Sequence, residues 1–248
     1  MVRWKLTLQY DGTRFAGWQR QPDQRTVQGE LERALSRFFD RETVVMGQGR
    51  TDSGVHAEGQ VAHSDFPEPV DSDRLFRAMR SLLPPDMALI RAEAVPAGFH
   101  ARFDASSRRY RYQISLQPVP LMKHLYWELP YDPDPDSLHR TAELVQGSHD
   151  FKNFSRLEDE EANSHCTITR SQWTIEGTRL FYRIEGDRFL RHLVRRLTGS
   201  MVLAATGRST LEEFQLLLEG GDVARKGHSA PAHGLLLESV HYPTDSGC

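Results

Sequence analysis

Apolar residues alternate or recur at helical spacing along the first half of this chain, and the pattern predicts strand, helix, strand, strand, helix and strand. Thr26 can cap the first helix, because its hydroxyl can accept from the backbone of the first turn. Pro84 and Pro85 stop the second helix, since proline lacks the N–H that a helix interior requires. The predicted segments are residues 3–10, 26–38, 44–46, 60–64, 75–82 and 88–95.

The second half of the chain repeats this order without obvious sequence identity. Thr210 and Glu213 predict a capping box for a short helix that ends at Gly220 and Gly221. The other predicted segments are a strand over 109–116, a helix over 138–145, a hairpin over 168–185, a long apolar helix over 189–205 and a strand over 235–242. Two βαββαβ patterns predict an α+β fold with two ferredoxin-like halves, residues 1–104 and 105–248. We expect the halves to form one extended mixed, mainly antiparallel sheet with helices packed on one side.

Composition limits the class of protein. The 248 residues carry a net charge of −3, and no apolar run reaches the roughly 18 residues of a membrane span. The N-terminus enters a strand pattern directly, without a signal-peptide architecture. Cys166 and Cys248 are too few for a disulfide framework or a cysteine zinc cluster. We expect a cytoplasmic protein.

The basic residues are unevenly distributed. Only four of the 31 are lysine, a bias that codon usage in a GC-rich genome explains better than function does. Clustering is more informative, because local arginine groups on an acidic protein can still bind a phosphate backbone. The two clusters are Arg102, Arg108, Arg109 and Arg111, and Arg188, Arg191, Arg195 and Arg196.

The segment between the second and third predicted strands reads GQGRTDSGV, residues 47–55, and contains one acid, Asp52. Its glycines allow positive φ and close approach of another backbone. An acid on such a loop, beside Arg50 and His56, suits chemistry or binding. The other interpretation is a surface turn in which Asp52 caps its own backbone, and spacing alone does not separate the two.

Two further positions could contribute to a site. Alternation in the strand over 109–116 puts Tyr110 and Tyr112 on one face, either as core aromatics or as a ring that stacks on a base. Arg195 lies on the long apolar helix, where a buried guanidinium needs a carboxylate or phosphate partner. Asp52 is the attractive candidate for that partner.

Several classes of site lack support in the sequence. There is no P-loop, no Rossmann glycine fingerprint and no HExxH, and neither His149-Asp150 nor His165-Cys166 has a partner at metal-ligand spacing. Ser53, His56 and Asp52 lie too close on one loop for triad geometry, and a nucleophile elbow is missing. The motifs therefore give no support to a metal or to an organic cofactor.

The ordered motifs of the chain resemble the tRNA pseudouridine synthase A (TruA) family. The resemblance covers nearly the whole chain, and its specificity comes from six segments in the same order. They are YDGTRFAGWQRQ (10–21) with TVQGELE (26–32), GRTD (49–52), FHARFDA (99–105), RYRY (109–112), FLRHLVR (189–195) and APAHGL (230–235). Leu193 stands where the family usually has Met and Ser53 where Ala is common, and neither departure touches the proposed chemistry.

The resemblance implies isomerisation of uridine to pseudouridine at positions 38, 39 and 40 of the tRNA anticodon arm. It implies that Asp52 is the essential aspartate, that Tyr110 is the active-site tyrosine and that Arg195 is the arginine paired with Asp52. Arg50 would help to extrude the target nucleotide. The partners implied are tRNA and a second copy of the chain, with neither DNA nor a membrane.

Two rival functions remain at this stage. A non-catalytic RNA-binding protein on the same fold would bind tRNA and leave every uridine unchanged. A small-molecule enzyme with ferredoxin-like halves would show binding that does not depend on salt, unlike binding to a phosphate backbone. Mapping of pseudouridine on tRNA transcripts separates these functions from an isomerase.

Overall fold

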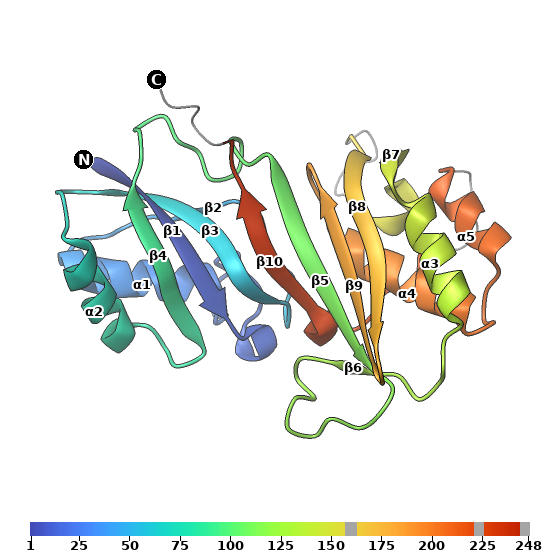
Figure 1. Ribbon diagram of the computed structural model, residues 1–248. Helices are drawn as coiled ribbons and strands as arrows, with labels where there is room; N and C mark the ends of the chain where they lie inside the picture. Colours follow the sequence, from blue (N-terminus) through green and yellow to red (C-terminus); the bar gives the residue numbers. More distant parts are fainter. Residues whose placement is uncertain (157–162, 221–225, 244–248) are drawn as a thin grey trace. The chain divides into compact units, whose positions relative to one another are not determined.

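The computed structural model describes residues 1–156, 163–220 and 226–243, so Gly221 and Cys248 lie outside the described residues. The chain divides into two units. Unit 1 comprises Met1–Ser106 and Leu237–Cys248, and unit 2 comprises Ser107–Leu236. Each unit combines strands with helices, which confirms the predicted α+β class (Figure 1).

Unit 1 contains a sheet with the central order β4-β1-β3, in which β1 is antiparallel to both neighbours. The short strand β2 pairs with β3 in antiparallel orientation, so the predicted βαββαβ half has the order β4-β1-β3-β2. The elements are β1 (Val2–Tyr10), α1 (Val27–Phe39), β2 (Met46–Gly47), β3 (His56–Phe66), α2 (Ser72–Leu82) and β4 (Met87–Ala94).

The core of unit 1 lies between its sheet and its two helices (Figure 1). The predicted N-cap of α1 is confirmed, because Thr26 Oγ1 accepts from the Gly29 N–H at 3.3 Å. The predicted alternation in β1 is also confirmed, because Trp4, Leu6, Leu8 and Tyr10 are all buried. Fully buried aliphatic side chains from both layers fill this core: Leu6, Leu8, Leu31, Leu35, Leu75 and Met79.

Unit 2 contains a sheet of order β5-β9-β8-β7, in which each strand is antiparallel to its neighbours. The short strand β6 pairs with β5 in parallel orientation. Its helices α3, α4 and α5 contact one another beside this sheet (Figure 1). The elements are β5 (Ser107–Ser115), β6 (Trp127–Glu128), α3 (Pro135–Leu144), β7 (Gly147–Asp150), β8 (His165–Glu176), β9 (Arg179–Gly186), α4 (Leu193–Ala205) and α5 (Leu211–Leu218).

The C-terminal strand β10 (Leu235–His241) returns to unit 1 from residue Leu237 onward. It lies beside β3, where a Cβ on Gly59 would come within 2.6 Å of the Glu238 carbonyl oxygen. The predicted division into residues 1–104 and 105–248 therefore lies two residues from the observed change at Ser106, but it places residues 237–248 with the other half.

The predicted start of the long helix is wrong. We predicted a helix over 189–205, whereas α4 begins at Leu193. His192 adopts the left-handed conformation at φ 69°, and the Leu193 N–H donates to the Leu190 carbonyl oxygen in a tight turn. The apolar residues before that turn belong to a loop, and one of them, Phe189, packs against Tyr110 of β5. Their spacing in the sequence resembles that of a helix, which explains the wrong prediction.

Candidate active site

The loop 47–55 connects β2 to β3 and carries Asp52 in a tight turn. The Val55 N–H donates to the Asp52 carbonyl oxygen at 3.2 Å. Gly54, at the third position of this turn, has φ 79°, a conformation that glycine adopts without steric cost. The Asp52 side chain is half-buried. The turn therefore presents the carboxylate from a defined backbone.

The loop is held by the segment that follows β1. Tyr10 and Thr51 are both buried, and their hydroxyls hydrogen-bond at 2.9 Å. The Trp18 N–H donates to the Thr51 carbonyl oxygen at 3.1 Å. Gly17 has φ 95°, and a Cβ there would lie 2.7 Å from the same carbonyl oxygen. Hydrogen bonds therefore fix both the side chain and the backbone of Thr51, the residue directly before Asp52.

Two more glycines, Gly12 and Gly47, allow the loop and its supporting segment to pack closely together. A Cβ on Gly12 would overlap the Val55 carbonyl oxygen. A Cβ on Gly47 would lie 2.5 Å from the Trp18 ring. The sequence does not predict these individual contacts; its one signal is that Gly12 and Gly17 recur in a segment with no repeating apolar pattern.

His56 links the same two segments. It is buried, and its Nδ1 accepts from the Gly12 N–H at 2.9 Å. Asp11 Oδ1 also lies 3.1 Å from this nitrogen. The acceptor role at Nδ1 places the ring proton on Nε2, whereas an ion pair with Asp11 would require a proton on Nδ1 as well. His56 is therefore a structural residue of the loop.

Arg50 lies on the exposed side of the loop. Its Nε donates to Gln19 Oε1 at 3.2 Å, and Gln19 belongs to the same supporting segment. The guanidinium is therefore directed by a side chain while it stays accessible to a ligand. Arg50 and Asp52 are two of the four predicted site residues, and both are carried by this loop of unit 1.

Unit 2 carries the other two predicted residues, Tyr110 and Arg195. The predicted alternation in β5 is confirmed, since Tyr110 and Tyr112 are buried while Arg109 and Arg111 alternate with them. The Tyr110 ring lies edge-on to Phe189, with ring centroids 5.0 Å apart. This T-shaped contact is compatible with both interpretations of the two tyrosines, which are core packing and stacking on a base.

Arg195 lies in the first turn of α4. Its Nε donates to the Ala230 carbonyl oxygen at 2.9 Å, and the Ala230 N–H donates to the Arg195 carbonyl oxygen at 3.0 Å. The Tyr112 hydroxyl donates to the Pro231 carbonyl oxygen at 2.7 Å. Burial raises the pKa of Tyr112 well above its ordinary value, and the Arg195 charge opposes part of that shift.

Several residues of the arginine clusters already bind protein groups. Arg109 forms an ion pair with Glu185 at 2.7 Å, and an Arg108 guanidinium nitrogen donates to the Asp187 carbonyl oxygen at 2.6 Å. Burial and the charges of Arg156 and Arg195 lower the pKa of Arg196. Several arginines of the two clusters therefore stabilise the fold, a role that their clustering in the sequence does not indicate.

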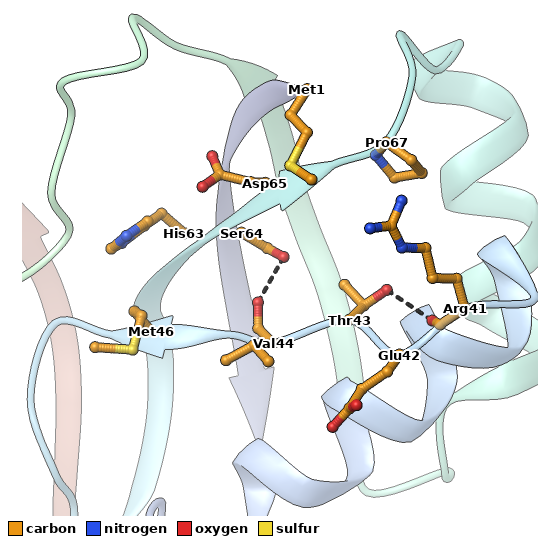
Figure 2. A pocket seen from close by; sticks show the side chains of 10 residues that line it. All are labelled: Met1, Arg41, Glu42, Thr43, Val44, Met46, His63, Ser64, Asp65 and Pro67. Atoms are coloured by element: carbon orange, nitrogen blue, oxygen red, sulfur yellow. Dashed lines mark hydrogen bonds between the residues drawn. The ribbon is translucent and has the colours of Figure 1, made fainter.

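A hollow of about 200 Å³ lies elsewhere in unit 1, and none of its lining residues belongs to the loop 47–55 (Figure 2). Ser64 and Thr43 donate to the carbonyl oxygens of Val44 and Arg41, at 2.7 and 3.1 Å. Because these side chains are satisfied by the protein itself, the hollow is a poor candidate for catalysis. Its lining residues are Met1, Arg41, Glu42, Thr43, Val44, Met46, His63, Ser64, Asp65 and Pro67.

Across residues 1–156, 163–220 and 226–243, no group of three or more His, Cys, Asp or Glu side chains could hold a metal ion. No helix within those same ranges is long and apolar enough to cross a membrane.

Comparison with known proteins identifies the relatives of this chain. The family model described as tRNA pseudouridine synthase matches residues 7–104 and 141–243. A protein named tRNA pseudouridine synthase A from Porphyromonas gingivalis is 38% identical, with 99% of each chain covered. Proteins of the same name from Xanthobacter autotrophicus and Bacillus subtilis are 40% and 39% identical, and the alignments cover 98% and 97% of this chain and 100% and 99% of theirs.

Proposed function

Because this chain belongs to the tRNA pseudouridine synthase family and isomerises uridine in tRNA, we propose that Asp52 is the carboxylate that performs the reaction. One observation carries the proposal. Asp52 is the single acid of the loop 47–55, and that loop is fixed by the segment after β1 through buried hydrogen bonds and glycine contacts. A catalytic group needs such a fixed position, since small displacements lower rates strongly.

The chemistry requires few groups. The bond between uracil N1 and ribose C1′ breaks, the base rotates, and a bond forms between C5 and C1′. C5 loses its proton and N1 gains one, so the product is an isomer and no oxidant or reductant is consumed. A carboxylate can act in this sequence as a nucleophile or as a base, which is the chemistry that Asp52 offers.

We propose that the substrate uridines are positions 38, 39 and 40 of the anticodon arm. A base in a stem must be flipped out before it reaches a pocket, at a cost of a few kcal/mol. Arg50 is suited to hold the vacated position, because Gln19 directs its guanidinium and the side chain is exposed. Arginine is also the residue best matched to the phosphates beside a flipped nucleotide.

Tyr110 and Arg195 complete the proposed site. Tyr110 would stack on the uracil, a role suited to an aromatic ring; in the structure the ring is in T-shaped contact with Phe189. Arg195 would pair with Asp52 and keep the carboxylate ionised. These two residues lie in unit 2 and Asp52 lies in unit 1, so the pairing stays a prediction.

The family also supports two proposals about the protein in the cell. We propose that it acts as a homodimer, with both copies holding one tRNA, and that it works in the cytoplasm, where tRNA is processed. Analytical ultracentrifugation of the purified protein tests the first proposal, and a protein that remains monomeric with bound tRNA would contradict it.

The decisive experiment maps pseudouridine by position on unmodified tRNA transcripts after incubation with the protein. We expect modification at positions 38 to 40. Asp52→Ala should lower the rate by about 1,000-fold or more while tRNA binding changes little, because phosphate contacts dominate affinity. Asp73→Ala is the matched control, since Asp73 is an exposed acid on α2 of the same unit. Full activity of Asp52→Ala would exclude the proposed mechanism.

A further inference from the structure

The turn 99–104 of unit 1 is fixed by hydrogen bonds to one histidine. The His100 N–H donates to Asp104 Oδ2 at 2.8 Å. The backbone N–H groups of Arg102 and Phe103 both donate to His100 Nδ1, at 3.2 and 3.3 Å. The Asp104 N–H closes the turn on the His100 carbonyl oxygen at 3.1 Å. The turn therefore has one defined backbone conformation.

The same turn is attached to the sheet of unit 1 through Ala101, which is fully buried. The Ala101 N–H donates to His63 Nδ1 on β3 at 3.2 Å. Its carbonyl oxygen accepts from the Tyr242 hydroxyl at 2.7 Å. Arg3 on β1 donates to the Phe99 carbonyl oxygen at 2.9 Å. Attachments from three segments leave the turn little freedom to move.

A series of rings runs outward from the sheet and ends at the surface. The His63 and His100 ring centroids are 4.8 Å apart, and those of His100 and Phe103 are 4.4 Å apart with an angle of 33° between the planes. Phe103 is 75% exposed. A fixed aromatic ring with an open face is a stacking surface for another planar group.

The charge beside this ring indicates which planar group it fits. The Arg102 guanidinium carbon lies 5.7 Å from the Phe103 ring centroid, and the side chain is exposed. An aromatic face with an adjacent guanidinium matches a nucleotide, whose base stacks and whose phosphate carries the opposite charge. The function assigned to this chain supplies such a ligand in tRNA.

We propose that Phe103 and Arg102 bind an unpaired nucleotide of the tRNA, with its base on the Phe103 ring and its phosphate at Arg102. The proposal rests on the proposed function only in naming tRNA as the ligand. Along β3, His56 beside the loop 47–55 and His63 beside this turn are seven residues apart, which is roughly 20 Å. The bound nucleotide therefore differs from the target uridine, and the contact contributes to affinity rather than to chemistry.

The test measures binding of an unmodified tRNA transcript to the full chain, together with single-turnover isomerisation at saturating tRNA. Phe103→Leu keeps an apolar side chain but removes the stacking face, and we expect an affinity about 5- to 100-fold lower with an unchanged saturated rate. Phe103→Tyr should bind like the parent. Ile90→Ala, an exposed apolar residue of β4, is the control and should change neither quantity.

Two results would overturn the proposal. Parental affinity in Phe103→Leu would show that no base stacks on the ring. A change of oligomeric state in Phe103→Leu, measured by ultracentrifugation without tRNA, would assign the ring to a protein interface instead. Failure of the proposed function is distinguishable, because it would appear as a parent protein that binds tRNA and leaves uridine unchanged, and the binding comparison would still stand.

Discussion

The two units hold their candidate residues in different ways. In unit 1, Asp52 lies on a loop whose position depends on a few close contacts, among them the glycine approach at Gly12 and the hydroxyl pair of Tyr10 and Thr51. In unit 2, Tyr110 and Arg195 lie on a regular strand and a regular helix. The loop should therefore respond to single changes in its neighbours, whereas strand and helix should hold their residues after such changes.

The histidines of the two units also differ in their hydrogen-bonding role. His56 and His63 in unit 1 accept backbone N–H groups at Nδ1. His149 and His233 in unit 2 lie 2.9 and 3.0 Å from carbonyl oxygens through Nε2, so their rings act as donors there. Because protonation of His63 would set a donor against the Ala101 N–H, unit 1 should lose stability in acid.

Outside the four candidate site residues, the largest effect is expected from Gly12→Ala, which tests the dependence of the loop on close approach. The new methyl group would overlap the Val55 carbonyl oxygen, so the loop must shift. A displacement of about 1 Å can lower a rate by about 100-fold, and we expect a loss of that size in single-turnover assays. Gly98→Ala is the matched control, since a Cβ there meets no atom within 4 Å. Equal activity of the two variants would refute the role of the glycine contact.

The next largest effect is expected on the stability of unit 1 at acidic pH. Burial, followed by the charges of Arg3 and His100, lowers the pKa of His63 to about 4 from 6.5 in the unfolded chain, and the charges of Asp65 and Asp104 oppose part of this shift. Above pH 6.5 both states are neutral at this residue. As the pH falls from 6.5 to 4, the unfolded state takes up a proton and the folded state does not, so stability falls by roughly 3 kcal/mol at most.

Urea unfolding between pH 7.5 and 4.5 measures this change. His63→Asn removes the titration and offers an amide oxygen in place of Nδ1, so its stability should depend less on pH than that of the parent. Identical pH dependence in the two proteins would show that His63 is not the acid-sensitive group.

The smallest effect is expected in unit 2 from Tyr112→Phe. Loss of the hydroxyl leaves the partly buried Pro231 carbonyl oxygen without this donor, which should cost about 1 kcal/mol in thermal or urea unfolding. The isomerisation rate should be unchanged, because β5 still holds Tyr110. Tyr110→Leu is the paired variant and should lower the rate, because it removes the ring that would stack on the uracil. The comparison between units fails if Tyr112→Phe lowers the rate as much as Tyr110→Leu does.

Local signals in the sequence predicted much of the fold. The Thr26 cap, the Thr210 and Glu213 capping box and the alternation around Tyr110 are all confirmed, because each depends on neighbours within a few residues. The start of α4 was missed because His192 adopts the left-handed conformation, which the spacing of apolar residues does not signal. The order of the motifs predicted the candidate site residues.

The support of the candidate site could not be predicted in the same way. The hydroxyl contact between Tyr10 and Thr51 joins residues 41 positions apart, and the glycine contact between Gly12 and Val55 spans a similar separation. Spacing along the chain does not report such contacts. The motif around Tyr10 was visible in the sequence, but its role as a support for the Asp52 loop required the fold.

The strand β10 has a consequence for biosynthesis. A ribosome releases the chain from its N-terminus, so Met1–Ser106 emerges first, and the segment from Leu237 that lies beside β3 emerges only after all of unit 2. The Tyr242 hydroxyl that fixes the turn 99–104 arrives later still. Unit 1 cannot complete its sheet during translation of its own first segment, and a nascent chain halted within unit 2 should leave that edge of β3 open to chaperones.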